Sequence, residues 1–216
     1  METDTLLLGF GDYREPARRL ADFLGLGFRE VEIHHFPDGE SRLRLPPELP
    51  PRVILCRSLD HPDDKLVELL LAAGGARELG AGELILVAPY LCYMRQDKAF
   101  HPGEVVSQRI IGHLLAGAFD GLITVDAHLH RVHRLSDAVP TRRSVNLTAT
   151  LPMARFLERE LDRPMLIGPD AESEQWVAAI AGHEGLDYRV ARKERFGDRE
   201  VRVTLPGADY GGRDLV

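Results

Sequence analysis

The sequence predicts an α/β protein made of two units, in which mainly parallel sheets are covered by helices. Short, almost continuous apolar runs, typical of strands buried on both faces, alternate with longer amphipathic stretches, typical of helices. A polar stretch at about 130–145 interrupts this alternation, which then starts again. We therefore expect one domain over residues 1–142 and the first part of a second domain, incomplete in this chain, over 143–216.

Signals at the helix ends support this assignment. The first helix has Pro16 near its first turn and Gly25 near its end, and the second begins with Asp63 and Asp64, which favour the positive end of a helix. In the first domain, strands are expected over 5–10, 29–35, 41–45, 52–57, 83–91 and 121–128, and helices over 15–25, 63–80 and 107–119. In the second, helices are expected over 149–161 and 172–182, and strands over 164–169, 187–192 and 200–205.

The composition is that of an ordinary globular protein. The 216 residues are 44% hydrophobic and 28% charged, so both a buried core and a solvated surface can form. The formal net charge of −7 argues against a nucleic-acid binder, which needs a basic surface. Cys56 and Cys92 lie inside apolar runs and are expected to be buried thiols of a cytoplasmic protein. Neither a signal peptide nor a membrane-spanning run is visible.

Three polar clusters follow predicted strands. Because ligands bind beyond the carboxyl ends of strands in open α/β sheets, these clusters are candidates for an active site. The cluster at 95–98 is either a charged loop or a polyphosphate site, in which Arg95 and Lys98 would bind phosphate oxygens. The other two clusters, at the ends of LITVDAHLH and MLIGPD, include His128 and Asp170.

The segment 34–40 joins two predicted strands. Its Pro-Asp-Gly sequence at 37–39 is a strong turn signal, and a turn alone would explain it. The alternative is a nucleotide-binding loop, in which the ring of Phe36 stacks on a base. The carboxylates of Asp38 and Glu40 would then accept hydrogen bonds from an amino group or from ribose hydroxyls.

A metal site is one interpretation of Asp126 and His128, with His130 and His133 nearby. The histidines lack the fixed spacing of zinc sites. Mg²⁺ prefers oxygen ligands and retains waters, so a histidine would be a minor ligand. Histidines 130 and 133 can equally be structural. Asp170 can equally cap the helix that follows it.

The charged run at 192–195 lies between two predicted strands. It is either a solvated hairpin or a mobile arm that brings cations to developing phosphoryl charge. The motif GxxxxGK[ST] is absent from the sequence, which excludes a P-loop enzyme. The motifs GxSxG and HExxH are absent as well.

Taken together and in order, these segments resemble the ribose-phosphate pyrophosphokinase (PRPP synthetase) family, and most of all its archaeal-type branch. The resemblance covers nearly the whole chain and the first two thirds of the family. Each segment is weak alone, but several in register are specific. They are FPDGE at 36–40, PYLCYMRQDK at 89–98, GEVVSQRIIGHLL at 103–115, TVDAH at 124–128, GPD at 168–170 and RKERFGDREV at 192–201.

The resemblance implies two phosphoribosyltransferase-type units and a homo-oligomer, dimer or hexamer, whose ATP site includes residues of a neighbouring subunit. It also implies a Mg²⁺-dependent transfer of the β,γ-diphosphate of ATP to the C1 hydroxyl of ribose 5-phosphate, giving PRPP and AMP. By position, it assigns Phe36, Asp38, Gly39, Glu40, Arg95, Gln96 and Asp97 to ATP, with Lys98 beside them. It assigns His128 and Asp170 to the metal, with Asp126 as support, and Lys193 and Arg195 to catalysis.

Two departures from the family pattern leave alternatives open. The family's ribose-phosphate-binding loop would follow Val216, so we expect the chain to be part of a longer protein. Glu172, Ser173 and Trp176 stand where the family has a Gly-Gly pair and an arginine, so another sugar phosphate is possible as acceptor. A non-catalytic regulatory homologue is a second hypothesis. A phosphoribosyltransferase is a third, against which the FPDGE and RQDK segments argue, because a transferase needs no ATP site.

Overall fold

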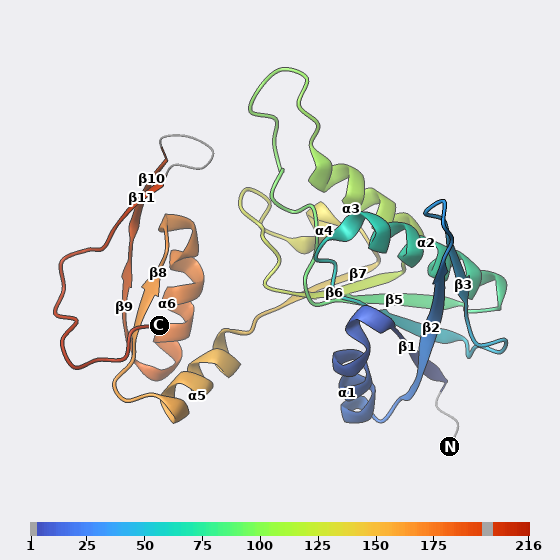
Figure 1. The fold of residues 1–216 in the computed structure, drawn as a ribbon, viewed down its shortest axis with the longest axis horizontal. Helices are drawn as coiled ribbons and strands as arrows, with labels where there is room; N and C mark the ends of the chain where they lie inside the picture. Colours follow the sequence, from blue (N-terminus) through green and yellow to red (C-terminus); the bar gives the residue numbers. More distant parts are fainter. Residues whose placement is uncertain (1–3, 196–200) are drawn as a thin grey trace. The chain divides into compact units, whose positions relative to one another are not determined.

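The computed structural model describes residues 4–195 and 201–216, with only the backbone of Arg195. The chain divides into two compact units, the first ending at Leu147 and the second beginning at Thr148 (Figure 1). The boundary expected at residue 142 lies slightly earlier in the sequence, before the last strand of the first unit.

The first unit is built on a seven-stranded sheet with the order β3-β2-β1-β4-β5-β6-β7. Neighbouring strands are parallel except β2 and β3, which form an antiparallel hairpin. The mainly parallel sheet expected from the apolar runs is thereby confirmed. The strands are β1 (Thr5–Phe10), β2 (Gly27–His35), β3 (Ser41–Arg44), β4 (Arg52–Cys56), β5 (Glu83–Ala88), β6 (Gly121–Val125) and β7 (Arg143–Leu147).

Helices cover both faces of this sheet (Figure 1). Successive strand residues point to opposite faces, so Leu7 of β1 packs with Ala17 and Ala21 of one helix, while Leu8 joins the larger core on the other face. Gly25, with a φ of 65°, ends the first helix in the left-handed conformation that its position predicted. The elements are η1 (Gly11–Tyr13), α1 (Arg14–Leu24), α2 (Pro62–Glu78), α3 (Ser107–Ala118) and α4 (Leu135–Ala138).

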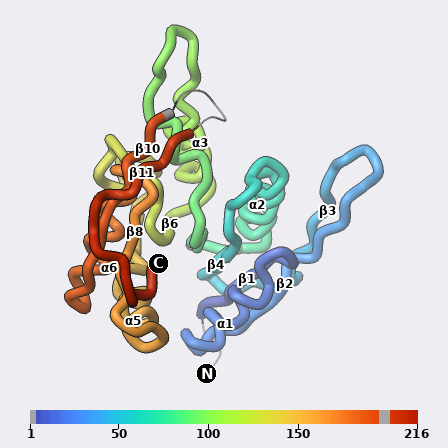
Figure 2. The backbone as a smooth tube through the Cα atoms, turned by 60° about the vertical axis from the view of Figure 1, so that its left-hand side comes forward, coloured from blue at the N-terminus to red at the C-terminus, as the bar shows by residue number. Residues whose placement is uncertain are grey.

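The strand order reverses between β1 and β4. Chain segments after β1 build the sheet in one direction, and those after β4 build it in the other, so the carboxyl ends of these two strands form the topological switch point. The β2–β3 hairpin and the long loop before α3 extend from the rest of the first unit (Figures 1 and 2).

The second unit begins with α5 (Thr150–Glu160) and contains β8 (Met165–Gly168), η2 (Ala171–Ser173), α6 (Glu174–Glu184), β9 (Asp187–Val190), β10 (Arg192–Arg195) and β11 (Val201–Thr204). Strand β8 pairs in parallel with β9 on one side. On its other side, the N–H of Ile167 donates to the carbonyl of Val216 at 2.7 Å. Strands β10 and β11 form an antiparallel hairpin. The core of this unit consists of Ala154, Leu157, Leu166, Ile180 and Ala181.

Helix α4 and the start of strand β7 lie within the polar stretch that was expected to separate the domains. Strand β7 is at the edge of the sheet, and its residues are exposed or only partly buried. Because an edge strand has a neighbour on one side only, it does not need the apolar run that marks a central strand. Among the described residues, no helix is both long and apolar enough to span a membrane.

Candidate functional site

A tight loop over residues 36–40 joins β2 to β3 and presents Phe36. The N–H of Phe36 donates to the carbonyl of Glu40 at 2.8 Å, and the N–H of Gly39 donates to the carbonyl of Phe36 at 2.9 Å. Gly39 has a φ of 93°, which glycine adopts without a steric penalty. A carboxylate oxygen of Asp38 accepts the N–H of Glu40 at 3.2 Å. The turn is therefore formed as its sequence predicted, and Phe36 remains 40% exposed at its start.

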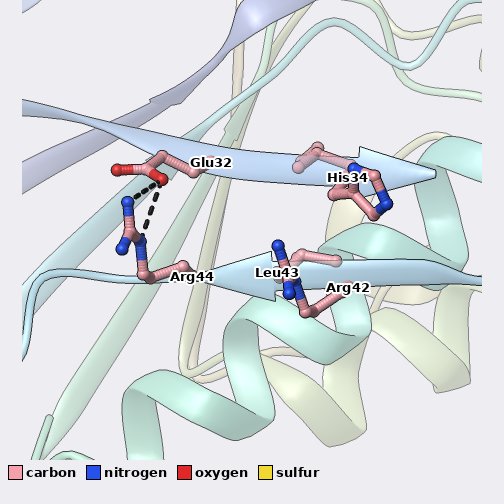
Figure 3. A pocket seen from close by; sticks show the side chains of 6 residues that line it. Glu32, His34, Arg42, Leu43 and Arg44 are labelled. Atoms are coloured by element: carbon pink, nitrogen blue, oxygen red, sulfur yellow. Dashed lines mark hydrogen bonds and ion pairs between the residues drawn. The ribbon is translucent and has the colours of Figure 1, made fainter. Parts of the chain in front are cut away.

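One face of the hairpin carries His34 and Arg42 next to Phe36. The ring of His34 contacts that of Phe36 edge-on, with centroids 4.9 Å apart, and the guanidinium of Arg42 lies 6.0 Å from the Phe36 centroid. Farther from the loop, Glu32 and Arg44 form an ion pair across the two strands (Figure 3). A cavity of about 380 Å³ is lined by this part of the hairpin.

A buried carboxylate holds both ends of the loop. Glu68 Oε1 accepts the Nε2–H of His35, the last residue of β2, at 2.7 Å, and the hydroxyl of Ser41, the first residue of β3, at 3.1 Å. Glu68 Oε2 lies 2.7 Å from Nη1 of Arg57. Burial raises the pKa of Glu68, but hydrogen bonds from His35, Arg57 and Ser41 and the charge of Arg57 outweigh it, so the pKa lies below its usual value.

The loop after β5 turns two cations outward, Arg95 and Lys98. Arg95 is exposed and has no carboxylate partner among the described residues. The side-chain amide of Gln96 donates to the carbonyl of Lys98 at 3.1 Å, so Gln96 shapes the loop. The ammonium of Lys98 lies 4.7 Å from the ring centroid of Phe100. Of the polar cluster at 95–98, the exposed cations Arg95 and Lys98 are therefore the side chains that can meet a phosphate.

Asp97 of the same cluster points inward and connects two loops. Its side chain is 1% exposed. Its carboxylate accepts the backbone N–H of Arg131 at 3.2 Å and Nη1–H of the same residue at 2.7 Å. Burial raises the pKa of Asp97, but these hydrogen bonds and the charge of Arg131 outweigh it and lower the pKa overall. The loop after β5 is thus joined to the loop after β6, which contains His128.

The loop after β6 begins with a strained residue. Asp126 has a φ of 44°, a left-handed conformation that costs a non-glycine residue about 1–3 kcal/mol. Its N–H donates to the carbonyl of Leu147 at 2.8 Å, and the N–H of Ala127 donates to the side chain of Asn146 at 3.0 Å. These bonds to β7 hold the strained turn, which places the partly buried His128 at the carboxyl edge of the sheet.

The described residues contain no cluster of three histidine, cysteine, aspartate or glutamate side chains that would hold a metal ion by themselves. The hypothesis of a zinc site at His130 and His133 therefore gains no support. Mg²⁺ commonly takes one or two protein ligands and completes its shell with substrate phosphates and waters. Asp126 and His128 in the first unit, and separately Asp170 in the second, offer oxygen and nitrogen atoms of the kinds that such a site uses.

In the second unit, Asp170 has two partners. Its Oδ1 accepts the N–H of Ser173 at 3.2 Å, and the Ser173 hydroxyl oxygen accepts the N–H of Asp170 at 3.4 Å, which together form a capping box at η2. Its Oδ2 lies 3.5 Å from the ammonium of Lys193 on β10. The backbone of Arg195 ends β10 opposite Val201, while its side chain lies outside the described part of the chain.

Ser173 has a structural role of its own. A Cβ atom at Gly168 would lie 2.6 Å from the Ser173 hydroxyl, so the capping box and the glycine at the end of β8 depend on each other. One departure from the family pattern is therefore explained by local structure. Glu172 is exposed and Trp176 is partly buried.

Several charged residues near these loops were not expected from the sequence. Two of them carried a signal. Arg57 directly follows the apolar run of β4, and Glu68 interrupts the apolar run LVELLL of α2. A charge at such a position is rarely buried unless it is paired, so each of these residues predicts a partner. Asp12, Lys65 and Arg131 follow no comparable pattern.

The comparisons with known proteins agree with one another. Residues 6–118 match the N-terminal domain of ribose phosphate pyrophosphokinase. Ribose-phosphate pyrophosphokinase from Methanopyrus kandleri is 35% identical over 202 residues, covering 92% of this chain and 68% of that protein. The protein of the same name from Saccharolobus solfataricus is 33% identical over 204 residues, covering 91% of this chain and 68% of that protein.

A solved structure supports the fold. Phosphoribosylpyrophosphate synthetase from Mycobacterium smegmatis matches with a TM-score of 0.77 at 20% identity, covering 98% of this chain and 70% of that chain. At this identity the likeness supports the architecture and not the function. The resemblance drawn from the sequence segments is confirmed by the family match and the relatives. The chain belongs to the ribose-phosphate pyrophosphokinase family of enzymes.

Proposed function

We propose that the protein transfers the β,γ-diphosphate of ATP to the C1 hydroxyl of ribose 5-phosphate. The hydroxyl oxygen bonds to the β-phosphorus, the bond from that phosphorus to the bridging oxygen of the α-phosphate breaks, and AMP leaves with that oxygen. The hydroxyl proton passes to solvent, and the product is PRPP. The observation that carries the proposal is the 35% identity, over 92% of the chain, to a protein named ribose-phosphate pyrophosphokinase.

In the first unit, the loops at the hairpin and after β5 would bind the nucleotide. The exposed ring of Phe36 offers a surface for a base, and the exposed carboxylates of Asp38 and Glu40 can accept from nucleotide N–H and O–H groups. Arg95 would bind phosphate oxygens, where a guanidinium can donate two parallel hydrogen bonds. Asp97 would act indirectly, because its buried carboxylate is already paired with Arg131.

In the second unit, Lys193 and Arg195 would stabilise the negative charge that spreads over the transferred group. Phosphoryl transfer depends mainly on positioning and on this neutralisation. Mg²⁺, when bound with its phosphate ligands, supplies further positive charge, and Asp170, His128 and Asp126 are the residues that would hold it. The contact of Lys193 with Asp170 supports a shared role, since it places a cation beside a prospective metal ligand.

A sugar-dependent assay tests the proposed reaction. The full-length protein is incubated with ATP, Mg²⁺ and ribose 5-phosphate, and AMP and PRPP are quantified. AMP that appears only with the sugar, in equal amount to PRPP, is the expected result. AMP formation that requires a different sugar phosphate would correct the acceptor. ATP binding without any turnover would instead favour a regulatory homologue.

We also propose that the protein is a homo-oligomer. The proposal rests on the family, in which a neighbouring subunit contributes to the ATP site. Light scattering coupled to gel filtration gives the mass directly. A dimer or hexamer is expected, and a monomer that retains full activity would contradict a shared site.

A further inference from the structure

The switch point of the first sheet is occupied by the chain's own charges. Asp12 follows β1 and Arg57 follows β4, and Nε of Arg57 donates to both carboxylate oxygens of Asp12 at 3.0 and 3.1 Å. The ammonium of Lys65 lies 3.1 Å from Asp12 and 3.0 Å from Asp60. Ligands of such sheets usually bind at this point. Here the cations are already neutralised by carboxylates of the same unit, so the cluster serves something other than direct binding.

Arg57 connects this cluster to the nucleotide hairpin. Its side chain is 7% exposed, and its guanidinium lies 4.5 Å from the ring centroid of Phe10. From this fixed position, its Nη1 lies 2.7 Å from Glu68, whose side chain is 3% exposed. Hydrogen-bonded charge pairs of low exposure hold one geometry, because breaking either partner leaves the other buried and unpaired. Glu68 therefore stands at a defined place on α2.

Glu68 in turn fixes both ends of the loop. His35 and Ser41 are cross-strand partners in the hairpin, and the same oxygen of Glu68 accepts from both. Strand β3 lies at the sheet edge and pairs with β2 alone, and an isolated two-stranded hairpin is only marginally stable. The hydrogen bonds to Glu68 hold the hairpin at the point where the loop leaves the two strands, directly before Phe36.

We propose that Glu68 is a positioning residue, which holds loop 36–40 through His35 and Ser41 in the conformation that accepts the nucleotide. Asp12 and Arg57 keep Glu68 in place. The identity of the ligand as MgATP rests on the proposed function, whereas the ordering of the loop does not.

The test changes the hairpin residues that bind Glu68 and leaves the buried Arg57–Glu68 pair intact. Glu68→Ala is avoided, because it would leave the buried Arg57 without a carboxylate partner and could unfold the protein. In the full-length protein, His35→Ala and Ser41→Ala are combined, and Arg44→Gln on the same hairpin is the matched control. The measurements are KM for ATP, kcat, the melting temperature and backbone amide exchange over residues 36–40. The conservative variant His35→Gln keeps an N–H donor for the carboxylate.

The double variant is expected to raise KM for ATP about tenfold or more, because it removes two hydrogen bonds to a charged group, with little change in kcat. Exchange should quicken over residues 36–40 and stay unchanged elsewhere. His35→Gln should restore most of the affinity, and Arg44→Gln should behave as wild type. Unchanged exchange and unchanged KM in the double variant would overturn the proposal, as would an equal effect from Arg44→Gln. If the wild type shows no turnover, the proposed function fails, and amide exchange with direct MgATP binding still decides the role of Glu68.

Discussion

The ammonium of Lys193 lies 3.5 Å from Oδ2 of Asp170, while Oδ1 of the same carboxylate caps η2. One side chain thus links a local structural role with the charged groups proposed for catalysis. The capping bond to Oδ1 holds the carboxylate at the carboxyl end of β8. The second oxygen, Oδ2, faces the ammonium of Lys193. Because the two oxygens have different partners, the capping role of Asp170 and its proposed role in catalysis can be tested by different substitutions.

Lys193→Ala is expected to lower kcat about 10²–10³-fold with little change in KM for ATP, because a cation that acts on developing charge matters most in the transition state. Steady-state AMP formation measures both constants. Arg192→Ala is the control, since Arg192 precedes Lys193 on β10 and neighbouring strand residues point to opposite faces. Equal losses in the two variants would contradict a specific role for Lys193.

Asp170→Asn separates the cap from the proposed metal ligand. Asparagine caps a helix about as well as aspartate, so the melting temperature should stay close to that of the wild type. The loss of the negative charge should raise the Mg²⁺ concentration for half-maximal activity about tenfold or more. Asp170→Ala should in addition cost about 1 kcal/mol of unfolding free energy. An unchanged Mg²⁺ requirement in Asp170→Asn would remove Asp170 from the metal site.

The Asp97–Arg131 pair should be energetically coupled. Arg131→Ala removes the guanidinium, which is 43% exposed, but keeps the backbone N–H that Asp97 also accepts, so this single change is expected to destabilise the protein by about 1–2 kcal/mol. The double variant Arg131→Ala/Asp97→Ala should cost less than the sum of the two single changes, by about 0.5–3 kcal/mol. Urea unfolding of the four proteins completes the cycle. Additive effects would mean that the ion pair adds nothing to the link that the backbone N–H of Arg131 makes with Asp97.

The order of strands and helices could be predicted because central parallel strands are apolar on both faces. The runs around Leu86 and Leu122 illustrate this signal, since both residues are fully buried. Strand β7 gave no such signal, because an edge strand with Arg143 and Asn146 looks like a polar connection. Long-range pairing places it beside β6, and such pairing leaves no local pattern in the sequence.

Some features of the candidate site could likewise be predicted from the sequence, and others could not. Turn chemistry and position predicted the loop that presents Phe36, and cap chemistry predicted one role of Asp170. The partners of Asp97 and Glu68 could not be predicted, because 34 positions separate Asp97 from Arg131 and 33 separate Glu68 from His35. A charged residue in an apolar run predicts that a partner exists, but only the three-dimensional fold determines which residue that partner is.

Acid should lower the free energy of unfolding, because some carboxylates have a pKa below the usual value in the folded protein. The pKa values of Asp97 and Glu68 are lowered in the folded state, so the unfolded chain binds protons first as the pH falls. Their stabilising contribution is complete above the unfolded values of about 3.9 and 4.3 and is lost as the pH falls through the lower folded values. Urea unfolding between pH 3 and 6 should show stability falling at the acid end, with a shallower fall in Glu68→Gln. An identical slope in that variant would mean that Glu68 titrates alike in both states.

The two thiols should be inert in the native protein. Burial raises the pKa of Cys56 and of Cys92 to about 12, and both side chains are buried as free thiols. Because the thiolate is the reactive form, a thiol reagent at pH 8 should label neither residue within minutes, and both within seconds in guanidinium chloride. Mass spectrometry of the labelled peptides assigns the sites. Labelling of Cys92 alone under native conditions would show that the loop after β5 opens locally, since Cys56 lies within strand β4.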